Sequence, residues 1–220
     1  INAKVPVWFP MNPTMGNYDK LFAKPAFLWL FNIVFISAMA MILTCITSAM
    51  AGYALAKKRF VGRSILFTLI VCAMALPKQV ILIPLLREMS SLQLYNTILG
   101  GIFPIVGWPF GVFDETVFRD SASELLEAAR IDGAGELRTF WDIVLPIVKP
   151  GVGALAIFTF VNTWNDYFMQ LIMLKKHDAI TVSLGIARLQ SEFATNYGLM
   201  MAGATLGAVP IVAVFICFQK

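Results

Sequence analysis

Polar and aromatic side chains gather in one short run of an otherwise apolar stretch. Asn162, Asn165 and Asp166 follow the helical spacing i, i+3 and i+4, so in a helix they share one face. Trp164 and Tyr167 lie beside them in the sequence. Amides, carboxylates and flat aromatic faces bind hydroxyl-rich solutes. The pattern favours a face that lines a solute route, and the alternative is hydrogen bonding between the helices of a bundle.

A second polar position is Lys78, which stands between Pro77 and Gln79 in another apolar stretch. An ionisable group inside a long apolar helix is costly and normally faces a cavity. Pro77 removes one backbone hydrogen bond, so a kink with a freed carbonyl is expected there. Lys78 and Gln79 are further candidates for the route, where Lys78 could attract an acidic solute. The alternative is a lysine that snorkels or hydrogen-bonds to freed carbonyls.

No group of residues in the sequence is suited to catalysis or to metal binding. His177 is the only histidine, and the three cysteines form no CxxC pair. The phosphate-binding pattern Gly-x-x-x-x-Gly-Lys-Ser/Thr is absent. We therefore predict no catalytic residue, no metal ligand and no bound cofactor, which disfavours an intramembrane enzyme. The net charge of +4 comes from scattered basic residues, so nucleic-acid binding is also disfavoured.

Composition places these residues in a membrane protein. Of the 220 residues, 59% are hydrophobic and only 14% are charged, whereas soluble domains carry about a quarter charged residues. A helix needs about 20 largely apolar residues to cross the hydrocarbon core. Because lipid offers no partner to an open backbone, each span must be helical. The sequence predicts an all-α, polytopic transmembrane helix bundle forming one domain, 1–220, with spans at about 26–56, 64–87, 89–113, 150–174 and 194–219.

Basic residues near the span ends set the expected orientation. Lys57, Lys58, Arg59 and Arg63 crowd the shortest loop, which we expect on the cytoplasmic side. Alternation then places a loop at about 114–149 inside and a loop at about 175–197 outside.

The inner loop holds most of the 13 acidic residues and has helix signals of its own. Ser121 and Glu124 form a capping box, which predicts the start of a helix. Asp132 and Gly133 close it, because glycine adopts a left-handed helix stop at little cost. A second short helix is expected from about Gly135, carrying Phe140 toward the next span. This helical pair predicts a cytoplasmic partner, and the alternative is an amphipathic connector lying on its own bundle.

At this loop the sequence resembles the permeases of binding-protein-dependent ABC importers. Glu127, Ala128 and Ala129, with Gly133 four residues later and then Leu145 and Pro146, match the family's EAA loop. The run from Glu127 to Ala134 and the run Trp164, Asn165 and Asp166 resemble the carbohydrate branch, specifically the shorter permease of the maltose-type pair. The resemblance covers nearly the whole chain.

The resemblance implies a type I importer permease architecture, in which the family usually has six spans. An N-terminal span and a C-terminal tail are accordingly expected beyond this sequence. It also implies that the loop docks on an ATP-binding subunit. Coupling roles then fall on these residues: Glu124, Glu127, Ala128, Ala129, Asp132, Gly133, Ala134, Phe140, Leu145 and Pro146.

The expected function is that of a non-catalytic permease subunit in the bacterial inner membrane. It would pass a sugar or oligosaccharide from an external binding protein to the cytoplasm by alternating access. The implied partners are a homologous permease, two ATP-binding subunits that hold ATP and Mg, and the solute-binding protein, which the outer loop would meet. A plain surface loop is the alternative for that last contact. The alternative functions are a permease for a non-sugar solute and a channel or secondary carrier that needs no partner.

Overall fold

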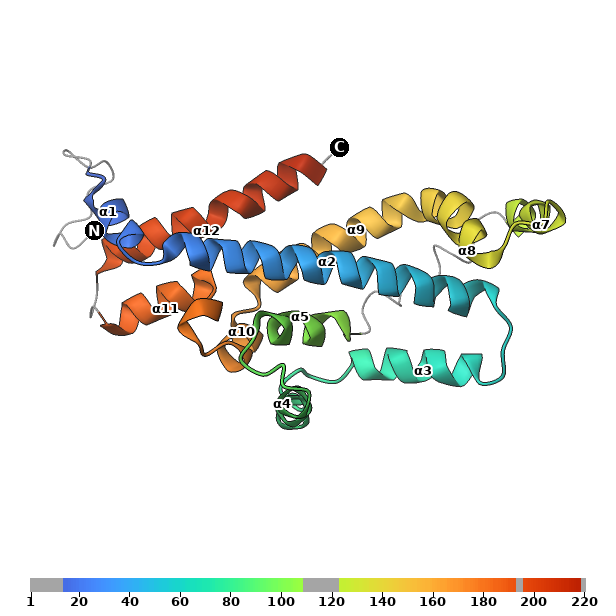
Figure 1. The fold of residues 1–220 in the computed structure, drawn as a ribbon, viewed down its shortest axis with the longest axis horizontal. Coiled ribbons are helices and arrows are strands. Elements are labelled where there is room, and N and C mark those ends of the chain that lie inside the picture. Colours follow the sequence, from blue (N-terminus) through green and yellow to red (C-terminus); the bar gives the residue numbers. More distant parts are fainter. Residues whose placement is uncertain (1–13, 109–122, 193–195, 219–220) are drawn as a thin grey trace.

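A computed structural model describes residues 14–108, 123–192 and 196–218, and within these ranges every regular element is a helix. Helix α2 (Ala26–Lys57) runs along the molecule, with α9 (Leu145–Asn165) and α12 (Tyr197–Phe218) beside it (Figure 1). The predicted all-α bundle is therefore confirmed. α2 packs chiefly against α9 and against α5 (Ile98–Val106).

The length and composition of α2 explain its central place. It begins after Pro25 and spans 32 residues, which at 1.5 Å per residue is about 48 Å. That exceeds the roughly 30 Å of a hydrocarbon core. Trp29, Ile33, Ile36 and Ala40 are buried, and their spacing places them on one stripe of the helix.

Among the residues that the structure describes, three helical runs have the length and apolar composition to cross a membrane: Ala26–Lys57, Glu136–Asn165 and Tyr197–Ile216. α3 (Arg63–Met74) is apolar but has only 12 residues, which is about 18 Å. The described chain thus contains fewer full-length spanning helices than the five expected from the sequence.

The structure divides the span predicted at 64–87. α3 ends at Met74, and α4 (Leu82–Ser91) starts only after a non-helical segment, residues 75–81. Figure 1 shows α4 end-on while α3 lies along the page, so the chain turns sharply between them. Pro77 supplies the reason, since its nitrogen has no hydrogen and its ring clashes with the preceding turn. Short turns replace the helical hydrogen bonds, among them the bond from Val80 N to the Pro77 oxygen, 3.0 Å.

Two other predicted spans also differ from the structure. Within 89–113, the helix starts only at Ile98, and residues 109–113 lie outside the described ranges. Gln93 and Asn96 have positive φ angles, 57° and 63°, which interrupt a helix. The span at 150–174 is two helices, α9 and α10 (Tyr167–Met173), because the backbone leaves the helical conformation at Asp166.

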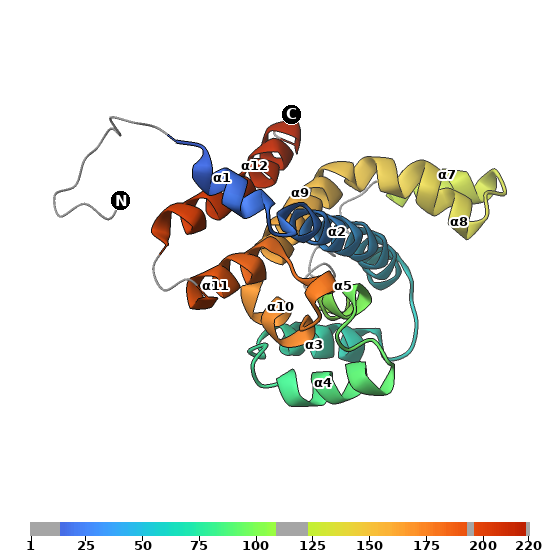
Figure 2. The same cartoon turned by 60° about the vertical axis from the view of Figure 1, so that its left-hand side comes forward.

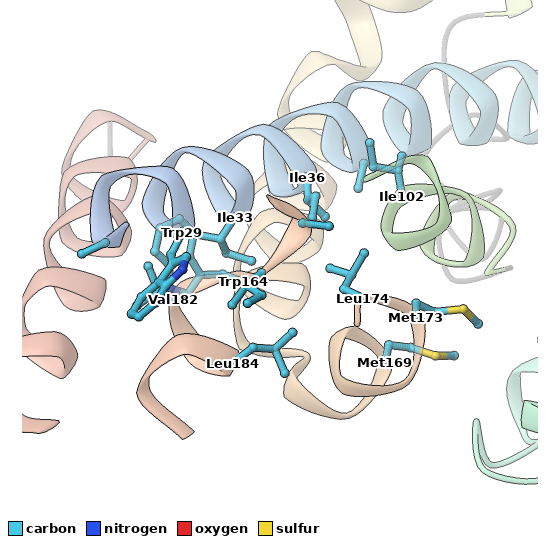
Figure 3. Close-up of a cluster of buried hydrophobic side chains, with 14 of the residues drawn as sticks. Trp29, Ile33, Ile36, Ile102, Trp164, Met169, Met173, Leu174, Val182 and Leu184 are labelled. Atoms are coloured by element: carbon cyan, nitrogen blue, oxygen red, sulfur yellow. The ribbon is translucent and has the colours of Figure 1, made fainter. Parts of the chain in front are cut away.

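The main hydrophobic core joins α2 to the C-terminal half of the chain. Figure 3 shows Trp29, Ile33 and Ile36 of α2 against side chains from α10 and from α11 (Val182–Glu192). Trp164 of α9 and Ile102 of α5 belong to the same cluster. α1 (Gly16–Phe22) packs on α12. A second, smaller core lies toward the C-terminal end of α2.

Two asparagines connect the bundle to the segment predicted as the outer loop. The buried Asn32 amide donates to the backbone oxygens of Asp178 and Ile180, at 2.8 and 2.9 Å. Asn96 Oδ1 accepts from the backbone nitrogens of Lys175 and Lys176, both at 2.7 Å. Residues 175–192 therefore form an ordered part of the bundle, including the short 3-10 helix His177–Ala179 and α11.

Gly185 of α11 offers a stability test of this packing. A Cβ atom there would lie 2.2 Å from Cε3 of Trp29, so Gly185→Ala is expected to lower the free energy of unfolding by about 1–3 kcal/mol through overpacking. Gly153 in α9 is the matched control, because a Cβ there meets nothing within 4 Å. Gly153→Ala is expected to be neutral or stabilising. Thermal unfolding of the two variants in detergent checks this, and equal transition temperatures would refute the contact.

Candidate functional site

The two helix interruptions meet inside the bundle. Lys78, from the 75–81 segment, places its Nζ 2.8 Å from Oδ2 of Asp166, at the α9–α10 break. The other carboxylate oxygen of Asp166 accepts from the backbone nitrogen of Met169, at 3.1 Å, and so caps α10. The Asp166 side chain is only 12% exposed. A carboxylate so placed is stabilised by its partners, because desolvation alone would disfavour its charge.

A cavity of about 230 Å³ adjoins this ion pair. It is half-open and lies between α2, α5, α9, α10 and the non-helical 75–81 segment. Its lining residues are Thr44, Lys78, Pro104, Ile105, Trp108, Phe158, Thr159, Asn162, Thr163, Asp166 and Met169. The Lys78 ammonium lies 5.7 Å from the centroid of the Trp108 ring, a cation–π distance. Irregular backbone is tolerated at membrane depth where it lines a cavity or is buried in protein.

The predicted route residues fall into two groups. Lys78, Asn162 and Asp166 line the cavity together. The carboxamide nitrogen of Asn162 donates to the backbone oxygen of Phe158, at 2.9 Å.

Trp164 lies in the main core and not in the cavity lining, since it is 4% exposed and stacks on Phe160 with ring centroids 5.7 Å apart. Asn165, Tyr167 and Gln79 are exposed and are not among the lining residues. Successive residues of a helix point in directions 100° apart, so the sequence neighbours of Asn162 and Asp166 point away from the cavity. The helix also breaks at Asp166, so Tyr167 does not continue the helical face that lines the cavity.

Several lining residues were missed by the sequence interpretation. Thr44 and Trp108 line the cavity but were not among the route residues predicted from the sequence. Within the described part of the chain, the Thr44 hydroxyl is buried without a hydrogen-bond partner. Only tertiary contacts bring these residues to the cavity, because they lie on α2 and after α5.

The predicted inner loop forms an elbow, residues 123–144, of α7 (Ser123–Ile131), a turn, α8 (Glu136–Thr139) and the π-helical segment Phe140–Val144. Gly133 has φ +73°, the left-handed conformation that its type predicted. The Ala134 nitrogen donates to the Ala129 oxygen, at 2.9 Å, which is the bond of a Schellman stop. α7 starts at Ser123, and Ser121 and the Glu124 side chain lie outside what the structure describes.

The elbow has a buried and an exposed face. Leu126 and Ala129 are buried, whereas Glu127, Ala128 and Asp132 are exposed. Large apolar side chains are exposed as well: Leu125 (51%), Ile131 (86%) and Leu137 (70%). In Figures 1 and 2, α7 and α8 lie at the end of the molecule remote from α1. An exposed apolar patch rimmed by charge is typical of a surface for a protein partner.

Three of the residues expected to take part in coupling pack between the elbow and the bundle. Ala129 is buried, and Phe140 is 5% exposed and lies 5.6 Å from the Tyr53 ring of α2. Leu145 packs against the same small core. Phe140 and Leu145 point toward the bundle because the π-helical segment and the start of α9 pack against α2. Pro146 is exposed.

A polar contact ties α8 to the end of α2. Glu136 pairs with Lys58 through one oxygen and accepts from the Tyr53 hydroxyl, at 3.2 Å, through the other. Glu136→Gln is expected to cost less than about 1 kcal/mol of stability, because the side chain is 60% exposed. Asp142→Asn, which breaks the exposed pair with Arg138, is the matched control. Denaturation of both variants in detergent checks this, and a loss of several kcal/mol at Glu136 would contradict it.

Comparison with known proteins places the chain in a family. Residues 45–220 match the binding-protein-dependent transport system inner membrane component family. The chain is 36% identical to the arabinooligosaccharide transport permease AraQ of Halalkalibacterium halodurans, over 97% of this chain and 78% of that protein. It is 31% identical to the sulfoquinovosyl glycerol permease SmoH of Agrobacterium fabrum, over 100% and 79%.

Solved structures agree with these relatives on the fold. A bacterial ABC transporter for the import of the acidic polysaccharide alginate matches with a TM-score of 0.84 at 21% identity, over 96% of this chain and 81% of that one. The chain thus has the helical fold of a type I importer permease. The chain therefore belongs to the family of binding-protein-dependent transport system inner membrane components, as a multi-pass, non-catalytic permease subunit.

Proposed function

We propose that this permease forms part of the membrane route for an oligosaccharide and is driven by ATP hydrolysis in partner subunits. One observation carries the proposal. The helical run Glu136–Asn165 is continuous over 30 residues, so it joins the elbow directly to the cavity wall at Asp166. A continuous helical run can transmit displacement along its length, and a push on the elbow would therefore move one wall of the cavity.

The exposed elbow surface supports an ATP-binding subunit as the partner. The exposed face of α7, opposite its buried face, carries Glu127, Ala128 and Ile131. A small residue such as Ala128 lets a second helix or groove approach closely, and Glu127 offers a carboxylate to a basic group. ATP and Mg would be held by that partner, and two such subunits would serve two permeases.

The solute class is supported by the cavity and by the relatives together. Three threonines, Asn162 and Trp108 line the cavity, and polar and aromatic side chains of these types suit a hydroxyl-rich ring. The named solutes of the relatives include arabinooligosaccharides, lactose and sn-glycerol-3-phosphate. An external binding protein would deliver the solute near residues 175–192, and a homologous permease would complete the route.

Reconstitution tests the proposal. The tagged chain is purified with its untagged partners from native membranes and placed in proteoliposomes with the external binding protein. Uptake of arabinotriose is expected only with ATP, and vanadate is expected to stop it. The chain reconstituted alone is expected to be inactive. Uptake by the chain alone, insensitive to vanadate, would identify a secondary carrier instead.

A further inference from the structure

The charges in the cavity cancel within this chain. Lys78 and Asp166 are the two charged members of the described lining, and they are in contact at 2.8 Å. The sequence alone left Lys78 able to attract an acidic solute. In the structure, its ammonium is directed to a carboxylate and to the Trp108 ring. An anion entering the cavity would therefore meet Asp166 as well as Lys78.

We propose that this cavity is a subsite for one uncharged sugar ring and that the Lys78–Asp166 pair sets its preference for neutral over acidic solutes. The inference rests on the proposed function and deepens it, because the relatives are named for both neutral and anionic solutes. It makes Lys78 and Asp166 specificity-determining residues that act together.

The volume of the cavity is comparable to that of one sugar ring. Its volume of about 230 Å³ exceeds the roughly 150 Å³ of an apolar cavity that admits benzene. It is below the roughly 300 Å³ at which sites for drug-sized ligands begin. A single six-membered ring fits between these limits. An oligosaccharide would place one ring here and its other rings along the route.

The lining also supplies polar groups that a neutral ring can use. The Thr44 hydroxyl is buried and has no hydrogen-bond partner among the described residues, and a buried polar group is normally satisfied. Thr44 is one of the residues that line the cavity, so this unpaired hydroxyl lies in the cavity wall. Asn162 adds a carboxamide, and the faces of Trp108 and Phe158 suit the apolar faces of a ring.

The pair predicts opposite effects for its two single substitutions. Asp166→Asn leaves the Lys78 charge uncompensated, which favours an acidic solute. Lys78→Met leaves the Asp166 charge uncompensated, which disfavours an acidic solute further. The double variant removes both charges, so it is expected to recover the wild-type preference. Such a sign pattern is not expected from loss of structure alone.

The experiment measures competition between two probes in proteoliposomes that hold the complete importer and its binding protein. Arabinotriose is the neutral probe and trigalacturonate the acidic probe. All variants share one binding protein, so a change in the uptake ratio reports the permease. We expect Asp166→Asn to shift the neutral-to-acidic ratio at least about tenfold toward the acidic probe, equivalent to about 1.4 kcal/mol. Lys20→Met, at an exposed lysine of α1, is the matched control.

The outcomes separate this inference from the function on which it rests. Wild-type uptake that favours trigalacturonate and is lost in Lys78→Met would overturn the inference, because Lys78 would then bind the solute anion. An unchanged ratio in Asp166→Asn would also overturn it while leaving ATP-driven sugar import intact. ATP-independent uptake, or uptake of neither probe, would remove the proposed function and the inference together.

Discussion

Gly133→Val is expected to abolish the stimulation of ATP hydrolysis by the binding protein in the assembled importer. Gly133 has φ +73° at the stop of α7, a conformation that a β-branched residue adopts only with strain. The strain changes the angle between α7 and α8. Under the proposed function, the 30-residue run from Glu136 would then no longer be displaced by α7, and the cavity wall would not move. Stimulated ATPase activity in proteoliposomes measures the effect.

Two further variants isolate the backbone conformation as the cause. Gly135 lies two residues on, with φ −68° and nothing within 4 Å of an added Cβ, so Gly135→Val is expected to retain stimulation. Gly133→Asn is expected to retain most of it, because asparagine tolerates the left-handed region. Full activity in Gly133→Val would show that the α7 stop has no part in coupling.

A second large effect is expected from Glu127→Lys on the exposed face of α7. Glu127 is exposed beside the apolar side chains of the elbow. If a basic group of the ATP-binding subunit faces it, a lysine there brings two like charges together, which costs several kcal/mol at an interface. The expected result is a loss of about 100-fold or more in affinity for that subunit. Co-purification of the untagged ATP-binding subunit from membranes measures it.

The matched control is Asp142→Lys, which reverses another exposed carboxylate nearby in the sequence. Its contact is with Arg138 in the same chain, so the ATP-binding subunit is expected to remain bound. The Glu127 variant is expected to stay in the membrane at the wild-type level, because the side chain is outside the core. Retention of the ATP-binding subunit by Glu127→Lys would contradict the proposed docking face.

The sequence predicted the helix ends that depend on local residue types, and it missed those that depend on tertiary contacts. Gly133 could be placed because a left-handed stop depends on one residue type and its neighbours. The interruption around Pro77 was expected as a kink, yet the helix breaks entirely, since the length of the break depends on what packs beside it. Asp166 gave no sign of ending a helix, because its cap on α10 forms only where the chain turns.

The same difference separates the route residues. Asn162 and Asp166 share a helical face, and periodicity alone identified them. Trp164 was chosen for its chemistry, but its ring lies in the core, and aromatic type does not distinguish these two environments. The partner of Lys78 lies 88 residues away in the sequence, and no local pattern connects such positions. Hydropathy likewise measured apolar length without showing that α3 and α5 are short.

The asparagine contacts at the α1 end have a mechanical consequence. Asn32 and Asn96 both form hydrogen bonds with the backbone of residues 175–180. The elbow lies at the end of the molecule remote from α1 (Figure 1). Under the proposed function, the bundle is held at these hydrogen bonds and displaced at the elbow. We expect a displacement of the elbow to produce a smaller shift at Asp166.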